Sequence, residues 1–424
     1  MRAKFTVGLI VIWAFSAGMA AAQNAVFPAT PLTRAENQFA FDLYGLLSQR
    51  SGNLVFSPFG AANVLDMVYL GAKGATAEEL ANVLHLSELS TVDLPSAPAL
   101  VQSVLERRLF TSQYKMPNAP IVELPGGFQF EDTDALWVAK GERLKPDYQA
   151  RIKSAFNGDL LSADFANAPG AAAQINNWVS SKTHGRITDL ISAAAINPRM
   201  RIMLTDVVYF KAGWATDFDV SESKSGMFHV APGHDVKVRM MHATGKYMIT
   251  RGDGMKMLQI PYLYDDASLL IILPDKPDGL SSVEAELSSQ ELNFWLEYAQ
   301  QFNVTMSIPA FTTGSTLDLS PNLQALGMKR AFAPSQADLG LIADAGSSPI
   351  YVGNVVQKAF IDVQEKGTEA AAATDMAINS AGIEPPMEDV TFVADHPFIY
   401  VIRANRSGDI LFMGRVENPA QHGM

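Results

Sequence analysis

The segment Glu365-Lys366-Gly367-Thr368-Glu369-Ala370-Ala371-Ala372-Ala373-Thr374 lies near the C-terminus of the 424-residue chain. After Gly367 its residues are small, and an alternation continues to Ser380, with Thr, Ala, Met and Ile on one parity and Glu, Asp and Asn on the other. Since successive side chains of a strand point to opposite faces, this pattern predicts a strand with a small, apolar inner face. Alanine is also the best helix former, so local propensity alone favours a helix. The position of the segment in the chain has to decide between a strand and a helix.

The N-terminus has the features of a secretory signal peptide. Arg2 and Lys4 precede an apolar stretch from Val7 to Phe15, and Ala20-Ala21-Ala22 provides a cleavage site before Gln23. An uncleaved membrane anchor is the competing interpretation. We expect residues 1–22 to be removed and residues 23–424 to form a single domain, because no linker-like stretch divides them. The product is expected to be secreted or periplasmic, from a bacterial source.

The composition of the chain limits the kinds of molecule that it can bind. The chain is 48% hydrophobic and carries a formal net charge of -12, which argues against nucleic acid or anionic membranes as partners. The segment 100–114 has only Arg107 and Arg108, so no polyanion site is evident. There are no cysteines, which excludes disulfides and thiol chemistry. A monomer is expected.

Capping boxes and apolar runs predict mixed helices and strands. Thr33 with Glu36 predicts a helix to about Gln49, and Thr76 with Glu79 predicts one through Leu84. Further helices are predicted at 61–70 and around 175–185, and strands at 54–56, 203–210 and 268–273. Without regular alternation of strand and helix, this favours an α+β fold with large, mostly antiparallel sheets.

Enzyme signatures are missing from the sequence. There is no G-x-S-x-G, H-E-x-x-H, phosphate-binding loop or glycine-rich dinucleotide turn. The closest two of the seven histidines, His229 and His234, have a spacing that suits no standard metal pair. We expect neither catalysis nor a metal or cofactor.

Several motifs resemble those of the serpin family, over residues 30 to 419. The matching segments are Asn53-Leu54-Val55-Phe56-Ser57-Pro58, Ile175-Asn176-Asn177-Trp178-Val179, Tyr209-Phe210-Lys211 with Trp214, 392–398 with 411–416, and the hinge segment 365–374 itself. The resemblance implies the serpin fold, with three β-sheets, about eight or nine helices and an exposed reactive-centre loop at about 367–391. In serpins a protease attacks this loop, which then inserts into the central sheet as a new strand and traps the enzyme as a covalent acyl complex. The segment is therefore interpreted as part of a loop that becomes a β-strand on insertion into the sheet.

The hinge of the loop is assigned to Glu365, Gly367, Thr368, Glu369, Ala370, Ala371, Ala372, Ala373 and Thr374. Family spacing from Glu365 places the reactive bond at Ala381-Gly382, whereas counting back from Phe392 gives Glu384, and Ile383 lies between. In every register, no Lys or Arg occurs between Lys366 and Arg403. This predicts elastase-like or subtilisin-like targets for Ala381 or Ile383, a glutamate-preferring protease for Glu384, and no trypsin-like target.

The sheet-opening region departs from the family pattern. It is assigned to Ser57, Gly60, Asp206, Trp214 and Gln357. Gly60 stands where Ser is usual, Asp206 where Asn is usual and Gln357 where His is common. Because a Gln does not titrate, sheet opening is predicted to be less sensitive to pH.

Two further expectations concern the hinge. Ala310 replaces a Lys that pairs with the hinge glutamate in some members, so Glu365 is expected to lack that salt bridge. The alternative function is a non-inhibitory serpin, acting as a binding or chaperone-like protein. It predicts bulky, charged or proline residues at the inward hinge positions, and this segment has none there.

Overall fold

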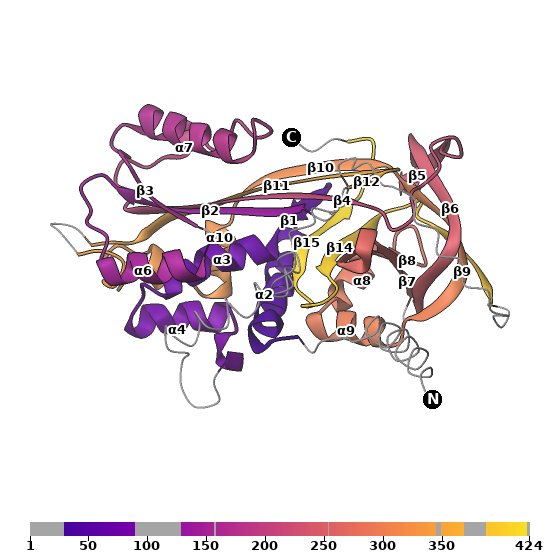
Figure 1. The fold of residues 1–424 in the computed structure, drawn as a ribbon, viewed down its shortest axis with the longest axis horizontal. Helices are drawn as coiled ribbons and strands as arrows, with labels where there is room; N and C mark the ends of the chain where they lie inside the picture. The colour runs from indigo at the N-terminus through magenta and orange to yellow at the C-terminus, as the bar shows by residue number, and fades with distance from the viewer. Residues whose placement is uncertain are drawn as a thin grey trace, which may run out of the picture.

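The computed structural model describes residues 29–89, 129–156, 158–252, 254–344, 349–368 and 387–421. These residues form two β-sheets surrounded by helices (Figure 1). The signal peptide, the segment 100–114 and most of the predicted reactive-centre loop lie outside the described residues.

The six-stranded sheet carries the region of interest. Its strands, in spatial order, are β10 (Phe311–Asp318), β11 (Val352–Gln364), β12 (Gly367–Thr368), β4 (Ile202–Gly213), β2 (Gln129–Ala139) and β3 (Asp159–Ala163). Strands β11 and β4 are parallel and also pair directly, from Val352 opposite Ile202 to Phe360 opposite Tyr209. β4 contains the predicted strand 203–210, and its burial on both faces explains the continuous apolar run.

The second sheet has nine strands. They are β1 (Leu54–Phe56), β15 (Ile410–Val416), β14 (Phe398–Ala404), β8 (Ala267–Pro274), β7 (Met255–Pro261), β6 (His234–Gly252), β9 (Gln300–Pro309) and β13 (Asp389–Val393) in order, with β5 (Lys224–Ala231) paired to β6. The long strand β6 pairs with β5 in its first part, with β9 in its middle part and with β7 at its end. It thereby joins two of the three expected sheets into one hydrogen-bonded unit.

Eight α-helices lie within the described residues. They are α2 (Pro31–Leu47), α3 (Pro58–Tyr69), α4 (Gly74–Val83), α6 (Pro146–Ala155), α7 (Ala168–Lys182), α8 (Leu280–Glu286), α9 (Ser289–Glu297) and α10 (Ser320–Leu326). Helix α7 covers one face of the six-stranded sheet, and α3 and α6 lie on the other (Figure 1). No helix in the described part is long and apolar enough to cross a membrane.

Both predicted capping boxes are wrong. Helix α2 begins earlier, because Thr30 is its N-cap and accepts a hydrogen bond from the Thr33 N–H at 3.1 Å. Helix α4 begins at Gly74 without a side-chain cap. The hydroxyl of Thr76 instead accepts from the Asp338 N–H, and the Glu79 carboxylate accepts from the N–H groups of Lys329 and Arg330. Side chains with the spacing of a local cap therefore form tertiary hydrogen bonds instead.

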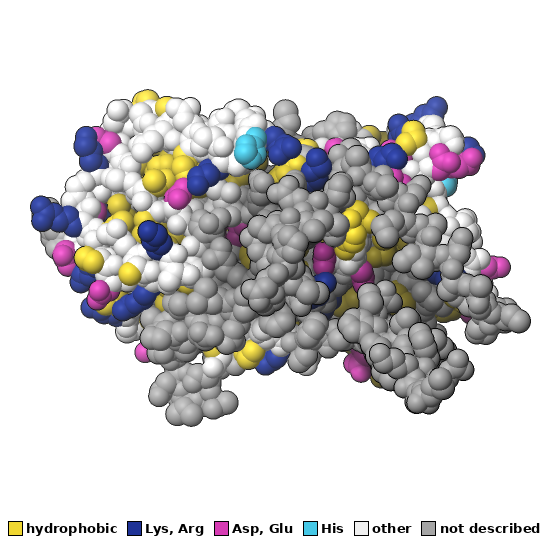
Figure 2. Space-filling model, in the orientation of Figure 1, with side chains coloured by type: hydrophobic (Ala, Val, Ile, Leu, Met, Phe, Trp, Pro, Cys, Tyr) yellow, Lys and Arg dark blue, Asp and Glu magenta, His cyan; other side chains and the backbone are white. Residues whose placement is uncertain are grey.

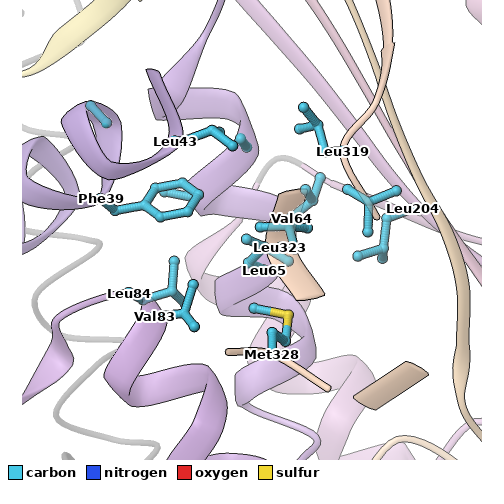
Figure 3. Packing of buried hydrophobic residues seen from close by; sticks show 14 of the residues in the cluster. Phe39, Leu43, Val64, Leu65, Val83, Leu84, Leu204, Leu319, Leu323 and Met328 are labelled. Atoms are coloured by element: carbon cyan, nitrogen blue, oxygen red, sulfur yellow. The ribbon is translucent and has the colours of Figure 1, made fainter. Parts of the chain in front are cut away.

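Helix α3 is the centre of the core below the six-stranded sheet. Every one of its residues is buried. Val64 and Leu65 of α3 pack among side chains of α2, α4 and α10 and near Leu204 of β4 (Figure 3). Since protein interiors are close-packed, α3 provides a rigid floor beneath β4 and β11.

Charged side chains of both signs are interspersed on the described part of the face shown in Figure 2, most visibly at its left-hand end.

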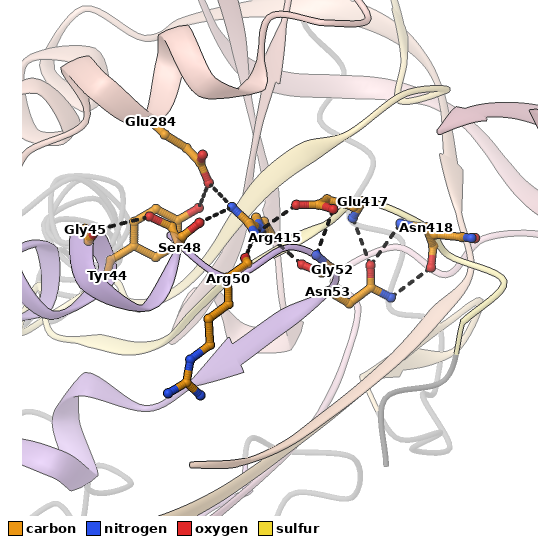
Figure 4. A network of polar contacts seen from close by, with 10 residues as sticks. All are labelled: Tyr44, Gly45, Ser48, Arg50, Gly52, Asn53, Glu284, Arg415, Glu417 and Asn418. Carbon is orange, nitrogen blue, oxygen red and sulfur yellow. Dashed lines mark hydrogen bonds and ion pairs between the residues drawn. The ribbon is translucent and has the colours of Figure 1, made fainter. Parts of the chain in front are cut away.

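A buried arginine ties the C-terminal strand to the N-terminal helix. Arg415 of β15 is 3% exposed and donates to the backbone carbonyls of Ser48, Arg50 and Gly52. Its guanidinium also contacts the carboxylates of Glu284 and Glu417, each at 2.9 Å (Figure 4). The planar fork of five donors suits this set of acceptors.

Replacing Arg415 with leucine is expected to lower the free energy of unfolding by about 3–5 kcal/mol, because two partly buried carboxylates lose their cation and three carbonyls lose donors. Denaturant unfolding of the intact protein measures this. Lys224→Ala is the control, because Lys224 and Glu222 form an exposed pair, and it should change stability by less than about 1 kcal/mol. Equal effects of the two variants would contradict the assignment.

Candidate functional site

The start of the predicted hinge lies inside the six-stranded sheet. Gly367 and Thr368 form β12, which pairs antiparallel with Val363 and Gln364 of β11 on one side and with the end of β4 on the other. Direct pairing of β4 with β11 stops just below, at Tyr209 and Phe360. The seam between β4 and β11 is therefore already open at one end and occupied by two hinge residues.

The remaining predicted hinge residues, Glu369 to Thr374, lie outside the described residues. So do Ala381, Gly382, Ile383 and Glu384, among which the reactive bond was predicted. Their assignment stays a prediction.

Gly367 is required by its backbone geometry. Its φ is +136°, a conformation that L-residues rarely adopt, and a Cβ there would clash with the backbone of Ala212 and Gly213 in β4. The chain leaves β11, turns at Glu365 and Lys366, and enters the seam at this glycine.

Thr368 is fully buried and anchored. Its hydroxyl forms a 2.7 Å hydrogen bond with the Tyr262 hydroxyl, and burial raises the pKa of that tyrosine. The Tyr262 ring stacks on Trp214, with centroids 4.6 Å apart and planes 8° apart. The Trp214 indole N–H donates to the Gln364 carbonyl at 2.8 Å. The predicted Trp214 thus supports the hinge, together with Tyr262, which the sequence reasoning missed.

Glu365 lacks a lysine partner at position 310, as expected, but it forms a salt bridge with another residue, Arg239, which the sequence reasoning missed. The Arg239 guanidinium lies 2.5 Å from the Glu365 carboxylate, and the Arg239 carbonyl accepts from the Ala310 N–H. The arginine therefore reaches the glutamate from the strand beside the position where the lysine was expected. Burial alone would raise the pKa of Glu365, but hydrogen bonds from Ser223 and its own N–H, with the charge of Arg239, hold it below its usual value.

Four of the predicted sheet-opening residues meet halfway along the seam, and we call Ser57, Gly60, Asp206 and Gln357 the latch. The Gln357 amide of β11 accepts from the Ser57 N–H at 2.9 Å and donates to the Ser57 carbonyl at 2.7 Å. It also donates to Asp206 Oδ2 on β4, at 2.5 Å. The latch therefore joins the two strands of the seam to the start of α3.

Gly60 and Asp206, which both depart from the family pattern, are sterically matched. A Cβ at Gly60 would clash with both carboxylate oxygens of Asp206. The Asp206 carboxylate thus occupies the space that a serine side chain at position 60 would need. The Ser57 hydroxyl still caps α3, by accepting from the Gly60 N–H at 3.1 Å.

The sequence reasoning missed two further carboxyl groups beside the latch. Asp134 of β2 lies directly opposite Asp206 in the sheet. One carboxylate oxygen from each of Asp132, Asp134 and Asp206 lies within 4.8 Å of the others. Asp132 is also bonded to the Asn63 amide of α3. The signal available was Asp132-Thr133-Asp134, two acids of one parity leading directly into the apolar run of a strand.

Two of the histidines have clear hydrogen-bonding roles. His229 bonds to Asp235, and His396 bonds to Asp395 and to the Pro274 carbonyl, each at 2.8 Å. His234 lies across the turn from His229, at the start of β6.

The site is thus a mixed sheet in an α+β fold whose central parallel pair, β4 and β11, is separated at one end by the next segment of the chain. The model of the family described as serpin (serine protease inhibitor) matches residues 34–419. The chain belongs to the serpin family.

Similar proteins come from distant organisms. An uncharacterized serpin-like protein of Thermococcus kodakarensis is 36% identical over 390 residues, covering 92% of this chain and 86% of the relative. The leukocyte elastase inhibitor of Homo sapiens is 30% identical over 402 residues, covering 92% and 99%.

Solved structures share the fold. A highly specific serpin of the insect Tenebrio molitor has a TM-score of 0.78 at 28% identity, covering 91% of this chain and 98% of that one. Human thyroxine-binding globulin in complex with thyroxine has a TM-score of 0.77 at 25% identity, covering 92% and 99%. These likenesses bear out the predicted serpin fold.

Proposed function

We propose that this serpin is a secreted or periplasmic suicide inhibitor of serine endopeptidases. The observation that carries the proposal is β12, because two hinge residues already lie between β4 and β11. The relatives named as leukocyte elastase inhibitors support the same function.

The register of β12 can be extended along the seam. An antiparallel strand continuing from Thr368 would place Ala370 between Ile361 and Phe210, and Ala372 between Ala359 and Val208. All four of these sheet residues are buried. The small residues of one parity would thus enter the crowded inner face, which is the arrangement that strand addition requires.

The same register leads to the latch. Thr374 would arrive between Gln357 and Asp206 by both of its pairings, and these two residues are themselves partners in the closed seam. Insertion must therefore break the Gln357–Asp206 hydrogen bond, and the Thr374 hydroxyl can replace part of it. No proline lies between Gly367 and Pro385, so each inserted residue can donate its N–H.

The chemistry is an interrupted hydrolysis. The protease serine attacks the carbonyl carbon of the reactive bond, the peptide C–N bond breaks, and an ester joins the loop to the enzyme while the new amino terminus departs. Twelve inserted residues would carry the attached enzyme roughly 40 Å at ~3.3 Å per residue. Inhibition results when this movement distorts the enzyme before water cleaves the ester.

The targets proposed are elastase-like or subtilisin-like enzymes, because the loop offers Ala381 or Ile383 and no basic residue. Glu384 would instead direct a glutamate-preferring protease. The likeness to thyroxine-binding globulin supports the alternative, a non-inhibitory binding protein.

Incubation with elastase, subtilisin and trypsin tests the proposal. We expect a complex with elastase or subtilisin that survives boiling in SDS, and none with trypsin. Mass spectrometry of the released C-terminal peptide identifies the reactive bond. Clean cleavage by elastase and subtilisin with no stable complex would favour the binding function and contradict inhibition.

A further inference from the structure

Four carboxyl side chains lie around the latch or on the helix beneath it. Asp206 of β4 and Asp66 of α3 are 0% exposed, Asp134 of β2 is 4% exposed, and Asp132 of β2 is half-buried. The Gln357–Asp206 hydrogen bond joins β4 to β11 within this group. The carboxyl groups of Asp132, Asp134 and Asp206 therefore lie together at a contact that must break when the seam opens.

These groups are poorly satisfied as ions. Asp206 Oδ1 and both oxygens of Asp66 are buried without a hydrogen-bond partner. Burial, followed by the charge of Asp132, raises the pKa of Asp206 well above its usual value, although donation from Gln357 acts the other way. Burial likewise raises the pKa of Asp66. Among the described residues, no basic side chain contributes to either shift.

A shared proton would allow the carboxyl groups of Asp206 and Asp132 to form a hydrogen bond with each other. Two ionised carboxylates are acceptors only, so neither can donate to the other. With one proton between them, the pair forms a carboxyl–carboxylate hydrogen bond. The groups that face Asp206 are Asp132 and Asp134 from β2, Gln357 from β11, and Ser57 and Gly60 at the start of α3.

We propose that the carboxyl cluster makes the latch a pH-dependent lock, in which a proton held by Asp206 and Asp132 keeps the seam closed and its loss favours opening. While β4 and β11 are joined, an ionised Asp206 is shielded from water. Separation of the strands admits water and relieves that cost. This differs from the lower sensitivity of sheet opening to pH that was predicted from Gln357 alone.

The direction in which the stability of the closed seam changes with pH follows from the raised pKa of Asp206. A carboxyl with a raised pKa in the closed state stabilises that state at low pH, and the stabilisation is lost as pH rises through the raised value. The window therefore begins above the ordinary aspartate pKa of about 4. Glu365 has a lowered pKa, so its contribution is lost only in acid, outside this window.

The first test is thermal unfolding of the uncleaved protein from about pH 5.5 to about pH 8.5, a range above ordinary carboxyl titration. In the wild type we expect the midpoint to fall by about 3–4 °C across this range because of the cluster. Asp206→Asn should lose most of that fall, with a higher midpoint than wild type at the alkaline end. Asp278→Asn, at an exposed carboxyl, is the matched control and should keep it.

Asp132→Asn is a second variant, in case Asp206→Asn does not fold, and should also flatten the profile because it removes the charge that faces Asp206. Equal pH profiles of the wild type and both variants would overturn the proposal. So would a rise in the midpoint with millimolar Ca²⁺ in the wild type but not in Asp206→Asn, because the cluster would then hold a cation rather than a proton.

The second test uses a synthetic peptide with the sequence of residues 368–379, and it rests on the proposed function. Its rate of incorporation into the uncleaved protein should rise several-fold from acid to alkaline pH, and the rise should be much smaller in Asp206→Asn. Incorporation at a pH-independent rate overturns the lock alone. No incorporation at any pH, with the thermal profile as expected, would count against strand addition and leave the lock supported.

Discussion

Thr368→Arg is expected to abolish trapping of the protease while leaving cleavage of the loop intact. Thr368 is 0% exposed and its hydroxyl is bonded to Tyr262. In the described part of the chain, Thr368 lies beside Val363, Ala212 and Tyr262, none of which offers an arginine a carboxylate, and burying an unpaired charge costs roughly 3–5 kcal/mol. The hinge should leave the seam, so that hydrolysis of the acyl bond outruns insertion.

The measurement is the stoichiometry of inhibition together with the amount of SDS-resistant complex. We expect no detectable complex and full cleavage at the reactive bond. Thr216→Arg is the matched control, since Thr216 is exposed shortly after the end of β4, and it should inhibit as the wild type does. An undiminished complex with Thr368→Arg would show that inhibition does not use this seam.

Cleavage of the reactive bond in the wild type is expected to raise the thermal midpoint by on the order of 10 °C. A fully inserted strand would add about a dozen backbone hydrogen bonds within the sheet, at about 1 kcal/mol each. For a chain of this length the gain corresponds to a shift of that size. Calorimetry of intact and cleaved protein at one scan rate measures the difference.

The cleaved Thr368→Arg variant supplies the control for this result. Its chain is cut at the same bond, but its hinge cannot enter the seam, so its midpoint should stay near that of the intact variant. If the wild type also gained no stability on cleavage, loop insertion would be contradicted even where complexes form with proteases.

The parts of the fold that could be predicted from the sequence are those set by local patterning or by motif. The strand 54–56 is confirmed as β1, and the helix that follows begins at Pro58, because Ser57 caps it. The ambiguous alanine run was resolved only by its position after Glu365. The structure confirms the strand for its first two residues, Gly367 and Thr368.

The remaining features depended on contacts between distant segments. Thr76 and Glu79 have the spacing of a capping box, yet both serve a segment some 250 residues later. Arg239 of β6 pairs with Glu365 in the turn after β11, and no local pattern marks it. The role of Tyr262 likewise depends on where β12 enters the sheet. The latch residues were found by their family positions, whereas the carboxyl cluster emerged only from the pairing of β2 with β4.

Because Trp214 stacks on Tyr262, movement of the hinge should be detectable by tryptophan fluorescence. Trp214 is one of five tryptophans, and through Tyr262 it is one hydrogen bond away from Thr368. Departure of Thr368 from the seam would let water reach this aromatic pair, which should change the tryptophan emission. A stopped-flow fluorescence trace, with Trp214→Phe as the blank, could therefore time the first movement of the loop without any attached label.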